Sequence, residues 1–298
     1  MEDLRADMSV TSPPPAAEIR RVESVVAREA VVDADTGGEL IYAIGDIHGS
    51  YDLMVELLAF AVEDTLTRAR SRPPMFIFCG DYIDRGPDSA KVVEALTLIQ
   101  RRADLELHLL KGNHEQALLA FLDNPREGAM WLQCGGAETL KSYGVEPPAP
   151  DGAPEAMDQA RDQLLARMPA SHLLLFQRLK LMVTAGDYAF VHAGVRPGVS
   201  LARQTEHDLL WIRRGFIDAS GPFEKVIVHG HTWTSDQPEL HPHRIGIDTG
   251  AYATGTLTAV RLDMAEMGVL QARRTLAAQA SAIPEVAAPV GCAARPAH

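Results

Sequence analysis

A pattern of strand, loop and helix repeats three times in succession between residues 40 and 122. In each repeat a short apolar run, LIYAI, FIFCG or LELHLL, ends at a polar loop, and a stretch with apolar residues at helical spacing follows. Parallel neighbours in a sheet need a crossover segment between them, so the repeat predicts consecutive βαβ units. Because the runs are apolar on both faces, we expect them in the middle of a layered α/β protein.

The loop after each of these strands carries side chains that can bind a metal ion. Loops at the carboxyl ends of parallel strands meet at one edge of a sheet and form its binding site. Two later apolar runs, YAFV and KVIV, also end beside histidines. The metal-competent residues after the five strands are Asp46 and His48, Asp81, Asn113 and His114, His192, and His231. One polar residue after a strand is typical of a turn, but five such loops are difficult to explain as turns alone.

The chemistry of these side chains points to a catalytic metal centre. Carboxylate, imidazole and amide ligands suit Mn²⁺, Fe or Zn²⁺, and the loops lack the thiolates of a closed structural zinc site. Asp81 lies between a buried strand and a helix, and its two oxygens could each bind one cation. The neighbouring Gly80 and Gly86 allow a tight turn around it, although for this stretch alone a simple turn remains an alternative. The five loops together predict a dinuclear metal centre.

Five sequence blocks, GDIHGSYDLM, GDYIDRGPDS, KGNHE, HAGV and HGHT, occur in this order between about Leu40 and Asp263. As a set they resemble the signature motifs of the phosphoprotein phosphatase family of calcineurin-like metallophosphoesterases, in its compact bacterial and phage type. The resemblance implies a β-sandwich core flanked by helices in α/β/β/α layers, with a dinuclear metal site at the carboxyl ends of the strands. It also implies two divalent metal ions as cofactors, Mn²⁺ ahead of Fe or Zn²⁺.

The resemblance assigns the metal ligands residue by residue. The ligands would be Asp46, His48 and Asp81 for one ion, and Asp81, Asn113, His192 and His231 for the other. Asp81 would bridge the two ions, which in such centres lie roughly 3.5 to 4 Å apart. The block HGHT offers two histidines, and the family's ligand directly precedes the threonine. We therefore assign His231 and expect His229 to lie behind it.

The resemblance also assigns an acid and a phosphate-binding residue. His114 would donate a proton to the leaving oxygen, and Asp84 would hold the other ring nitrogen and so fix its orientation. Arg85 would bind the phosphate, because a guanidinium group contacts phosphate oxygens in a bidentate manner.

Three further residues are assigned less directly. Asn113 is expected to contact the phosphate as well as a metal ion. Arg213, in the stretch WIRR, matches a second phosphate-binding arginine of bacterial and phage members better than Arg214 does, and the alternative is a surface arginine pair. Glu115 is expected only to favour the N-terminus of a helix electrostatically.

The activity implied is that of a metal-dependent phosphomonoesterase, a broad-specificity serine/threonine phosphatase with tyrosine phosphatase activity also open. It would hydrolyse phosphoproteins or small phosphomonoesters by attack of a hydroxide shared by the two metals. The alternative is the symmetrical diadenosine tetraphosphate hydrolase of the same fold, which typically lacks the aspartate of the DRG block and ends the third block in NHD. Asp84 and Glu115 occupy these positions here and favour the phosphomonoesterase. A catalytically inactive binding module would have lost metal ligands, and none is lost.

The expected domain organisation has three parts. Residues 1–38 are expected to form a flexible N-terminal arm, with a short helix around Glu18 to Arg28. Residues 39–275 would form the metallophosphatase catalytic domain, in which HRIGIDTGAY and GTLTAVRLD are expected to be edge strands. Residues 276–298 are rich in alanine and proline and are expected to be disordered.

Charge and composition restrict the partners and the location. A formal net charge of −12 and a pI near 5.4 argue against nucleic acid, because binding a phosphate backbone requires clustered lysine and arginine. The first residues, MEDLRADMSV, lack the basic and apolar regions of a signal peptide, and no stretch is apolar enough to cross a membrane. The three cysteines form no CxxC pair. We therefore expect a cytoplasmic protein without membrane or nucleic-acid partners.

Overall fold

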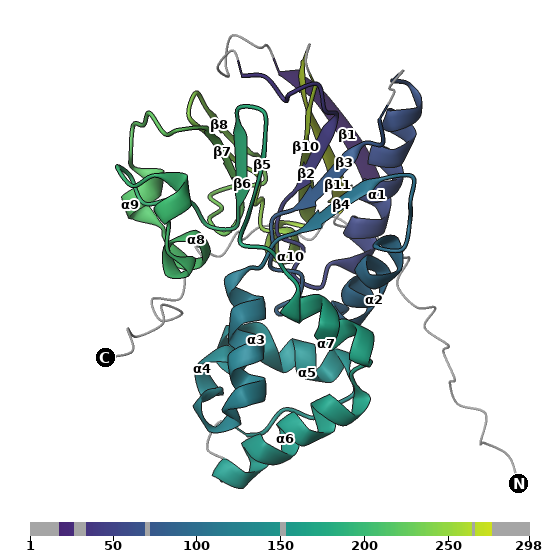
Figure 1. Ribbon diagram of the computed structural model, residues 1–298. Helices are drawn as coiled ribbons and strands as arrows, with labels where there is room; N and C mark the ends of the chain where they lie inside the picture. Colours follow the sequence, from purple (N-terminus) through teal and green to yellow (C-terminus); the bar gives the residue numbers. More distant parts are fainter. Residues whose placement is uncertain (1–17, 27–33, 69–71, 150–152, 264–265, 276–298) are drawn as a thin grey trace, which may run out of the picture.

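The computed structural model describes residues 18–26, 34–68, 72–149, 153–263 and 266–275. Two β-sheets pack face to face, and helices cover the outer face of each sheet (Figure 1). The predicted α/β fold with α/β/β/α layers is therefore confirmed.

The first sheet has, within the described residues, six strands in the order β1-β11-β10-β2-β3-β4. Their bounds are β1 Ile19–Val26, β2 Ile41–Ile44, β3 Met75–Phe78, β4 Glu106–Leu109, β10 Thr256–Leu262 and β11 Met267–Arg274. Strands β2, β3 and β4 are parallel, as the repeated sequence pattern predicts. The pairs that involve β1, β10 and β11 are antiparallel.

The second sheet has the order β5-β6-β7-β9-β8. Its strands are β5 Met182–Ala185, β6 Tyr188–Val191, β7 Val226–His229, β8 Glu239–His241 and β9 Arg244–Gly246. Strands β6, β7 and β9 are parallel to one another. The carboxyl ends of β6 and β7 carry the HAGV and HGHT blocks.

Alternating residues of the central strands divide the core into layers. Ile41 of β2 and Val228 of β7 belong to the apolar cluster between the sheets, whereas Tyr42 of β2 belongs to the cluster beneath the helices of the first sheet. Ile227 of β7 belongs to a third cluster beneath α8 and α9. Strands buried on both faces explain why the first sequence runs are apolar without alternation.

The helices follow the strands in the expected order. The two that pack on the first sheet are α1 Tyr51–Leu66 and α2 Ser89–Ile99, and the two on the second sheet are α8 Glu206–Trp211 and α9 Arg214–Ile217. A group of helices between β4 and β5 lies at the bottom of Figure 1. It contains α3 Asn113–Asp123, η2 Pro125–Glu127, α4 Ala129–Trp131, the π-helix η3 Leu132–Gly136, α5 Ala137–Ser142, α6 Pro154–Arg167 and α7 Ala170–Gln177. Two short segments complete the described set, η4 Leu201–Arg203 and α10 Ala251–Thr254.

The expectation of a short helix near the N-terminus is wrong. Residues of the expected arm form the strand β1, which pairs with β11 along its whole length. Arg21 of this strand also forms ion pairs with Glu56 and Glu63 on α1. Cross-strand pairing and these contacts outweigh the local preference of the sequence. The other parts of the expected arm, residues 1–17 and 27–33, lie outside the described residues.

The expectation that GTLTAVRLD is an edge strand is also wrong. This segment is β10, which lies between β11 and β2 and is buried along its whole length. Two further strands therefore lie beyond it in the sheet. The expected tail, residues 276–298, lies outside the described residues. In the part of the chain that is described, no helix has the length and apolar character needed to span a bilayer.

Candidate metal centre and active site

The five predicted loops converge at the carboxyl ends of the parallel strands in both sheets. Asp46 and His48 follow β2, Asp81 follows β3, Asn113 and His114 open α3 after β4, His192 follows β6, and His231 follows β7. Each of these side chains is buried, with at most 7% of the residue exposed. The structure therefore brings together residues that are up to 185 positions apart in the chain, as the backbone N–H of His231 donates to Asp46.

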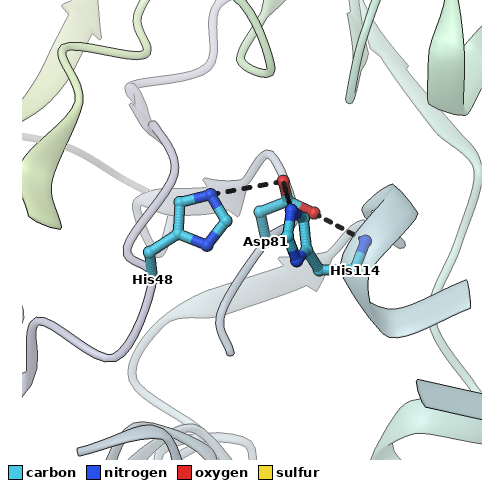
Figure 2. A group of neighbouring side chains, drawn as sticks. All are labelled: His48, Asp81 and His114. Carbon is cyan, nitrogen blue, oxygen red and sulfur yellow. Dashed lines mark hydrogen bonds and ion pairs between the residues drawn. The ribbon is translucent and has the colours of Figure 1, made fainter. Parts of the chain in front are cut away.

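Asp81 lies at the centre of the group. Its Oδ2 atom is 3.5 Å from Nε2 of His48 and 3.5 Å from Nε2 of His192. Two groups of side chains have the geometry to hold a metal ion, one with His48 and His114 and the other with His192 and His231, and Asp81 belongs to both. Figure 2 shows the first group, in which the carboxylate of Asp81 contacts both the ring of His48 and the backbone N–H of His114. A carboxylate common to both groups is the arrangement expected of a bridging ligand.

The tautomers of two histidines also fit metal binding. Nδ1 of His48 is 2.8 Å from the carbonyl oxygen of Ile83, and Nδ1 of His192 is 2.8 Å from the carbonyl oxygen of Cys79. A carbonyl only accepts, so both rings carry their proton on Nδ1 and present the lone pair of Nε2 to Asp81. Such a carbonyl contact is how proteins orient a histidine that binds a metal.

The second group brings electron-rich atoms close together. Oδ1 of Asn113 is 2.8 Å from Nε2 of His192 and 2.9 Å from Nδ1 of His231, and these two nitrogens are 3.2 Å apart. Of these three atoms, Nε2 of His192 carries no proton, because the proton of that ring is on Nδ1. Nε2 of His231 and Oδ1 of Asp46 are buried without a hydrogen-bond partner among the described residues. Buried orphan atoms and convergent lone pairs fit bound divalent cations.

Charge at the centre follows from burial and from these neighbours. Burial opposes ionisation of Asp81, but the surrounding histidines, led by His192 and His114, outweigh it and lower its pKa. The pKa of Asp46 is raised, first by burial and then by the charges of Asp248 and Asp81. Burial lowers the pKa of His48, which favours the neutral ring that a metal ion requires.

The backbone of the site is strained. Five non-glycine residues of the described chain have a positive φ, namely His48, Asp81, Asp84, Arg85 and His231. Each such conformation costs on the order of 1–3 kcal/mol and persists only where the surroundings fix it. Two glycines permit the close approach of the loops, because a Cβ at Gly112 would lie 2.1 Å from Oδ1 of Asp81 and one at Gly230 would lie 1.9 Å from Oδ1 of Asp46.

His114 and Asp84 form a buried pair beside the metal-competent groups. Nδ1 of His114 is 2.6 Å from Oδ2 of Asp84, so the ring donates from Nδ1, and Nε2 faces the centre, 3.9 Å from Oδ2 of Asp81. Burial lowers the pKa of His114, but the charges of Asp81 and Asp84 outweigh it, and the pKa is raised. The pair predicted from sequence is therefore formed.

Arg85 lies across the same centre. Its Nη1 donates to Nε2 of His48 and its Nη2 to Nε2 of His114, each over 3.1 Å. The guanidinium carbon is 4.8 Å from the ring centroid of Tyr252. This aromatic contact was not predicted from sequence.

Arg213 lies at the rim, with an exposed side chain. Burial of part of the group and the nearby charge of Arg85 lower its pKa, while Asp81, Asp248 and Asp46 act in the opposite sense. The phosphate-binding role of Arg213 stays a prediction.

Two acidic residues have larger roles in the structure than the sequence suggested. Glu115 accepts hydrogen bonds from the backbone N–H groups of Asp81, Tyr82 and Gly112 over 2.8 to 2.9 Å, so it ties two site loops together. The expectation that Glu115 only favours a helix terminus is too limited.

Asp248 was missed altogether. It is 5% exposed and follows β9, which is parallel to β7. Burial raises its pKa to about 6. The strand-end pattern that identified the other residues could have found it, because IDTG is a sixth loop of the same kind.

The family of the chain follows from comparison with known proteins. The sequence model of the calcineurin-like phosphoesterase family matches residues 40–244. The chain belongs to this family, and it is a metallophosphoesterase, a hydrolase that acts on phosphoesters with divalent metal ions.

Individual relatives differ in what they are named for. The chain is 24% identical over 260 residues to the bis(5'-nucleosyl)-tetraphosphatase PrpE [asymmetrical] of Oceanobacillus iheyensis, a match that covers 79% of this chain and 94% of that protein. It is 34% identical over 77 residues to the serine/threonine-protein phosphatase PP2A-like PPG1 of Saccharomyces cerevisiae, which covers 25% of this chain and 18% of that protein. A solved structure of a cold-active protein-tyrosine phosphatase from a Shewanella species is 16% identical, with a TM-score of 0.49 and coverage of 80% of this chain and 83% of that one.

Proposed function

We propose that the protein is a phosphomonoesterase that hydrolyses phosphoserine and phosphothreonine in proteins, together with phosphotyrosine and small phosphomonoesters. The observation that supports this most directly is the buried pair of His114 and Asp84, in which Nδ1 of His114 is 2.6 Å from Oδ2 of Asp84. A serine or threonine alkoxide is a poor leaving group and needs a proton from a positioned acid. With Nδ1 held by Asp84, His114 can present a proton from Nε2 to a leaving oxygen at the centre.

The metal ligands in this proposal are those implied by the sequence. One ion would be held by Asp46, His48 and Asp81, and the other by Asp81, Asn113, His192 and His231, with Mn²⁺ as the first candidate for both. When bound, two divalent cations offset the negative charge of a phosphate and make water more acidic. Two bound cations would allow a chain with a formal net charge of −12 to bind an anionic phosphate.

Three further side chains would bind the phosphate. The guanidinium group of Arg85 contacts Nε2 of His114. A small rotation of the Arg85 side chain can therefore turn this group away from the imidazole ring and toward phosphate oxygens. Asn113 lies beside His192 and can donate through its amide nitrogen. Arg213 at the rim would complete the set.

A second candidate is hydrolysis of dinucleoside tetraphosphates. It is favoured by the match with the tetraphosphatase relative, which extends over 94% of that protein, whereas the match with the yeast phosphatase spans 77 residues. The group that leaves in such a reaction is a phosphate, which is a stable anion and gains little from an acid. The fully formed acid pair therefore favours the phosphomonoesterase. Metal-competent side chains from all five loops converge, which disfavours an inactive binding module.

The test compares substrates and one variant. Purified protein with Mn²⁺ should hydrolyse p-nitrophenyl phosphate and phosphoserine peptides far faster than diadenosine tetraphosphate. His114→Asn should retain its metal content and lose at least roughly tenfold more activity on the phosphoserine peptide than on p-nitrophenyl phosphate, because nitrophenolate leaves without a proton. Asp84→Asn should show the same dependence in weaker form. Preference for diadenosine tetraphosphate would replace this proposal by the second candidate, and equal losses in His114→Asn would remove its role as the acid.

A further inference from the structure

We propose that Trp131 and Thr139 are positioning residues that hold Asp84, and through it His114, in the reactive orientation. The inference rests on the proposed function for the role of His114. The segment that carries them, residues 131–139, lies outside the five loops of the metal centre.

The carboxylate of Asp84 accepts from three side chains. Oδ2 accepts from Nδ1 of His114 over 2.6 Å and from the indole Nε1 of Trp131 over 2.8 Å. Oδ1 accepts from the hydroxyl of Thr139 over 2.6 Å. Asp84 is 0% exposed, so water does not compete for these positions. Donors on both oxygens prevent rotation of the carboxylate, and its plane then sets the direction of the His114 ring.

The same segment holds the strained backbone of the DRG block. Asp84 and Arg85 are consecutive non-glycine residues with φ values of 72° and 67°. The backbone N–H of Asp84 donates to Oγ1 of Thr139 over 2.9 Å, and that of Arg85 donates to the carbonyl oxygen of Gly135 over 3.2 Å. Conformations of this kind persist only where the surroundings fix them. Trp131, Gly135 and Thr139 supply those contacts.

A regular helix could not place both donors on one carboxylate. Residues 131 and 139 would lie about 12 Å apart along a straight α-helix, since each residue advances the chain by about 1.5 Å. The segment η3, Leu132–Gly136, is a kink between two helices, because Gly135 within it has a non-helical φ of 115°. This break brings Trp131 and Thr139 to opposite oxygens of the same group.

The two glycines of the break are required for the contact. A Cβ at Gly135 would lie 2.6 Å from the backbone nitrogen of Arg85, and one at Gly136 would lie 2.4 Å from Cε2 of Trp131. The sequence WLQCGGAET is therefore matched to Asp84 and Arg85 by shape as well as by hydrogen bonds.

The ring of Trp131 also packs against a neighbouring side chain, so the test must separate the loss of this packing from the loss of the N–H donor to Asp84. It packs against Phe121, with ring centroids 4.7 Å apart, and lines a cavity of about 550 Å³ beside His114. Replacing Trp131 by phenylalanine removes the N–H donor and keeps an aromatic wall. Phe121→Leu changes the packing of the wall and leaves the donors to Asp84 in place.

The first measurement uses substituted phenyl phosphates of similar size and different leaving-group basicity, in the metal-loaded full-length protein. Thr139→Val and Trp131→Phe should lose activity more on phenyl phosphate than on p-nitrophenyl phosphate, by about tenfold or more for Thr139→Val, within the range that acid catalysis supplies. Thr139→Ser keeps the hydroxyl and should restore the wild-type dependence. Phe121→Leu should affect both substrates equally.

The second measurement is independent of activity. In Zn²⁺-loaded protein with ¹⁵N-labelled histidine, the His114 signals, assigned by their absence in His114→Asn, should report a proton held on Nδ1 in the wild type and in Thr139→Ser. That proton signal should shift or broaden in Thr139→Val and in Trp131→Phe, which serves as the second variant if Thr139→Val does not fold. Unchanged leaving-group dependence and unchanged His114 signals in both would overturn the inference. A wild type without phosphomonoesterase activity would instead overturn the proposed function, and the His114 signals would still decide the positioning role.

Discussion

Asp81 is the residue that the two halves of the candidate metal centre share. It contributes to each metal-competent group, and its backbone N–H is held by Glu115. The histidines around it lower its pKa, which favours the ionised carboxylate. A neutral side chain of the same shape would keep the fold and lose the charge shared between the two groups.

We predict that Asp81→Asn weakens binding of both metal ions. An amide has one oxygen that can bind a cation, whereas a bridging carboxylate offers one oxygen to each. Metal content per chain, measured after dialysis, should fall from two ions in the wild type to one or none. Asp208→Asn is the matched control, because Asp208 is a buried aspartate that pairs with Arg196 outside the centre. An Asp81→Asn protein that retained two tightly bound ions and its activity would show that Asp81 is not a bridge.

The residues of the candidate site differ in how visible they are in the sequence. His192 and His231 could be found because each directly follows a recognisable strand. Asp248 follows the same rule and was overlooked. Trp131 and Thr139 could not be found in this way, because their role depends on contacts with Asp84 across 47 and 55 positions of the chain. No local period encodes such a contact.

At the level of elements, β1 shows where local sequence patterns fail. The segment IRRVESVV has apolar residues at positions compatible with helix or strand, and most of it is exposed. Its state is decided by β11, which is far away in the chain and supplies its hydrogen-bond partners. The strands β2, β3, β6 and β7 were predictable because each is a short run that is buried throughout.

The pairing of β1 leads to a prediction with a one-residue control. The backbone N–H of Thr275 donates to the carbonyl oxygen of Glu18. Hydrogen-bonded pairs alternate along an antiparallel ladder, so in the observed register the N–H of Ser24 points to Val269 of β11. The N–H of Val25, one residue later, points away from the sheet. Both side chains are exposed. Ser24→Pro should be less stable to urea than Val25→Pro by roughly 1–3 kcal/mol, because it removes a ladder hydrogen bond and the other variant does not. Equal stability of both variants and the wild type would support a mobile arm.

At the level of the whole molecule, Arg261 joins segments from opposite ends of the chain. It is fully buried in β10 and pairs with Glu23 of β1, Asp64 of α1 and Glu266 before β11, over 2.8 to 3.1 Å. A side chain at Gly268 would lie 2.7 Å from its guanidinium, so β11 leaves space for it. The sequence could not reveal this group, since the partners lie up to 238 positions away.

We predict that Arg261→Met destabilises the protein far more than a change to a surface arginine. Removing one partner of a fully buried ion pair costs about 3–5 kcal/mol. We expect Arg261→Met to cost less than this, because of the three carboxylates that lose this cation only Asp64 is mostly buried, whereas the side chains of Glu23 and Glu266 are more than a third exposed. Arg72→Met is the control, since Arg72 is exposed and pairs with Glu39 at the surface, where such pairs contribute about 0–1 kcal/mol. Urea unfolding at neutral pH measures both.

The pKa of Asp64 predicts how the stability difference between the wild type and Arg261→Met depends on pH. Burial raises the pKa of Asp64, but the hydrogen bond from Tyr42 and the charge of Arg261 outweigh it, so the pKa is lowered in the folded state. A lowered pKa contributes stability above the pKa of an unfolded aspartate, about 4, and this contribution is lost as the pH falls through the folded value. The stability difference between wild type and Arg261→Met should therefore narrow on acidification below about pH 4. A difference that stayed constant or widened there would show that Arg261 stabilises the fold by packing and not by charge.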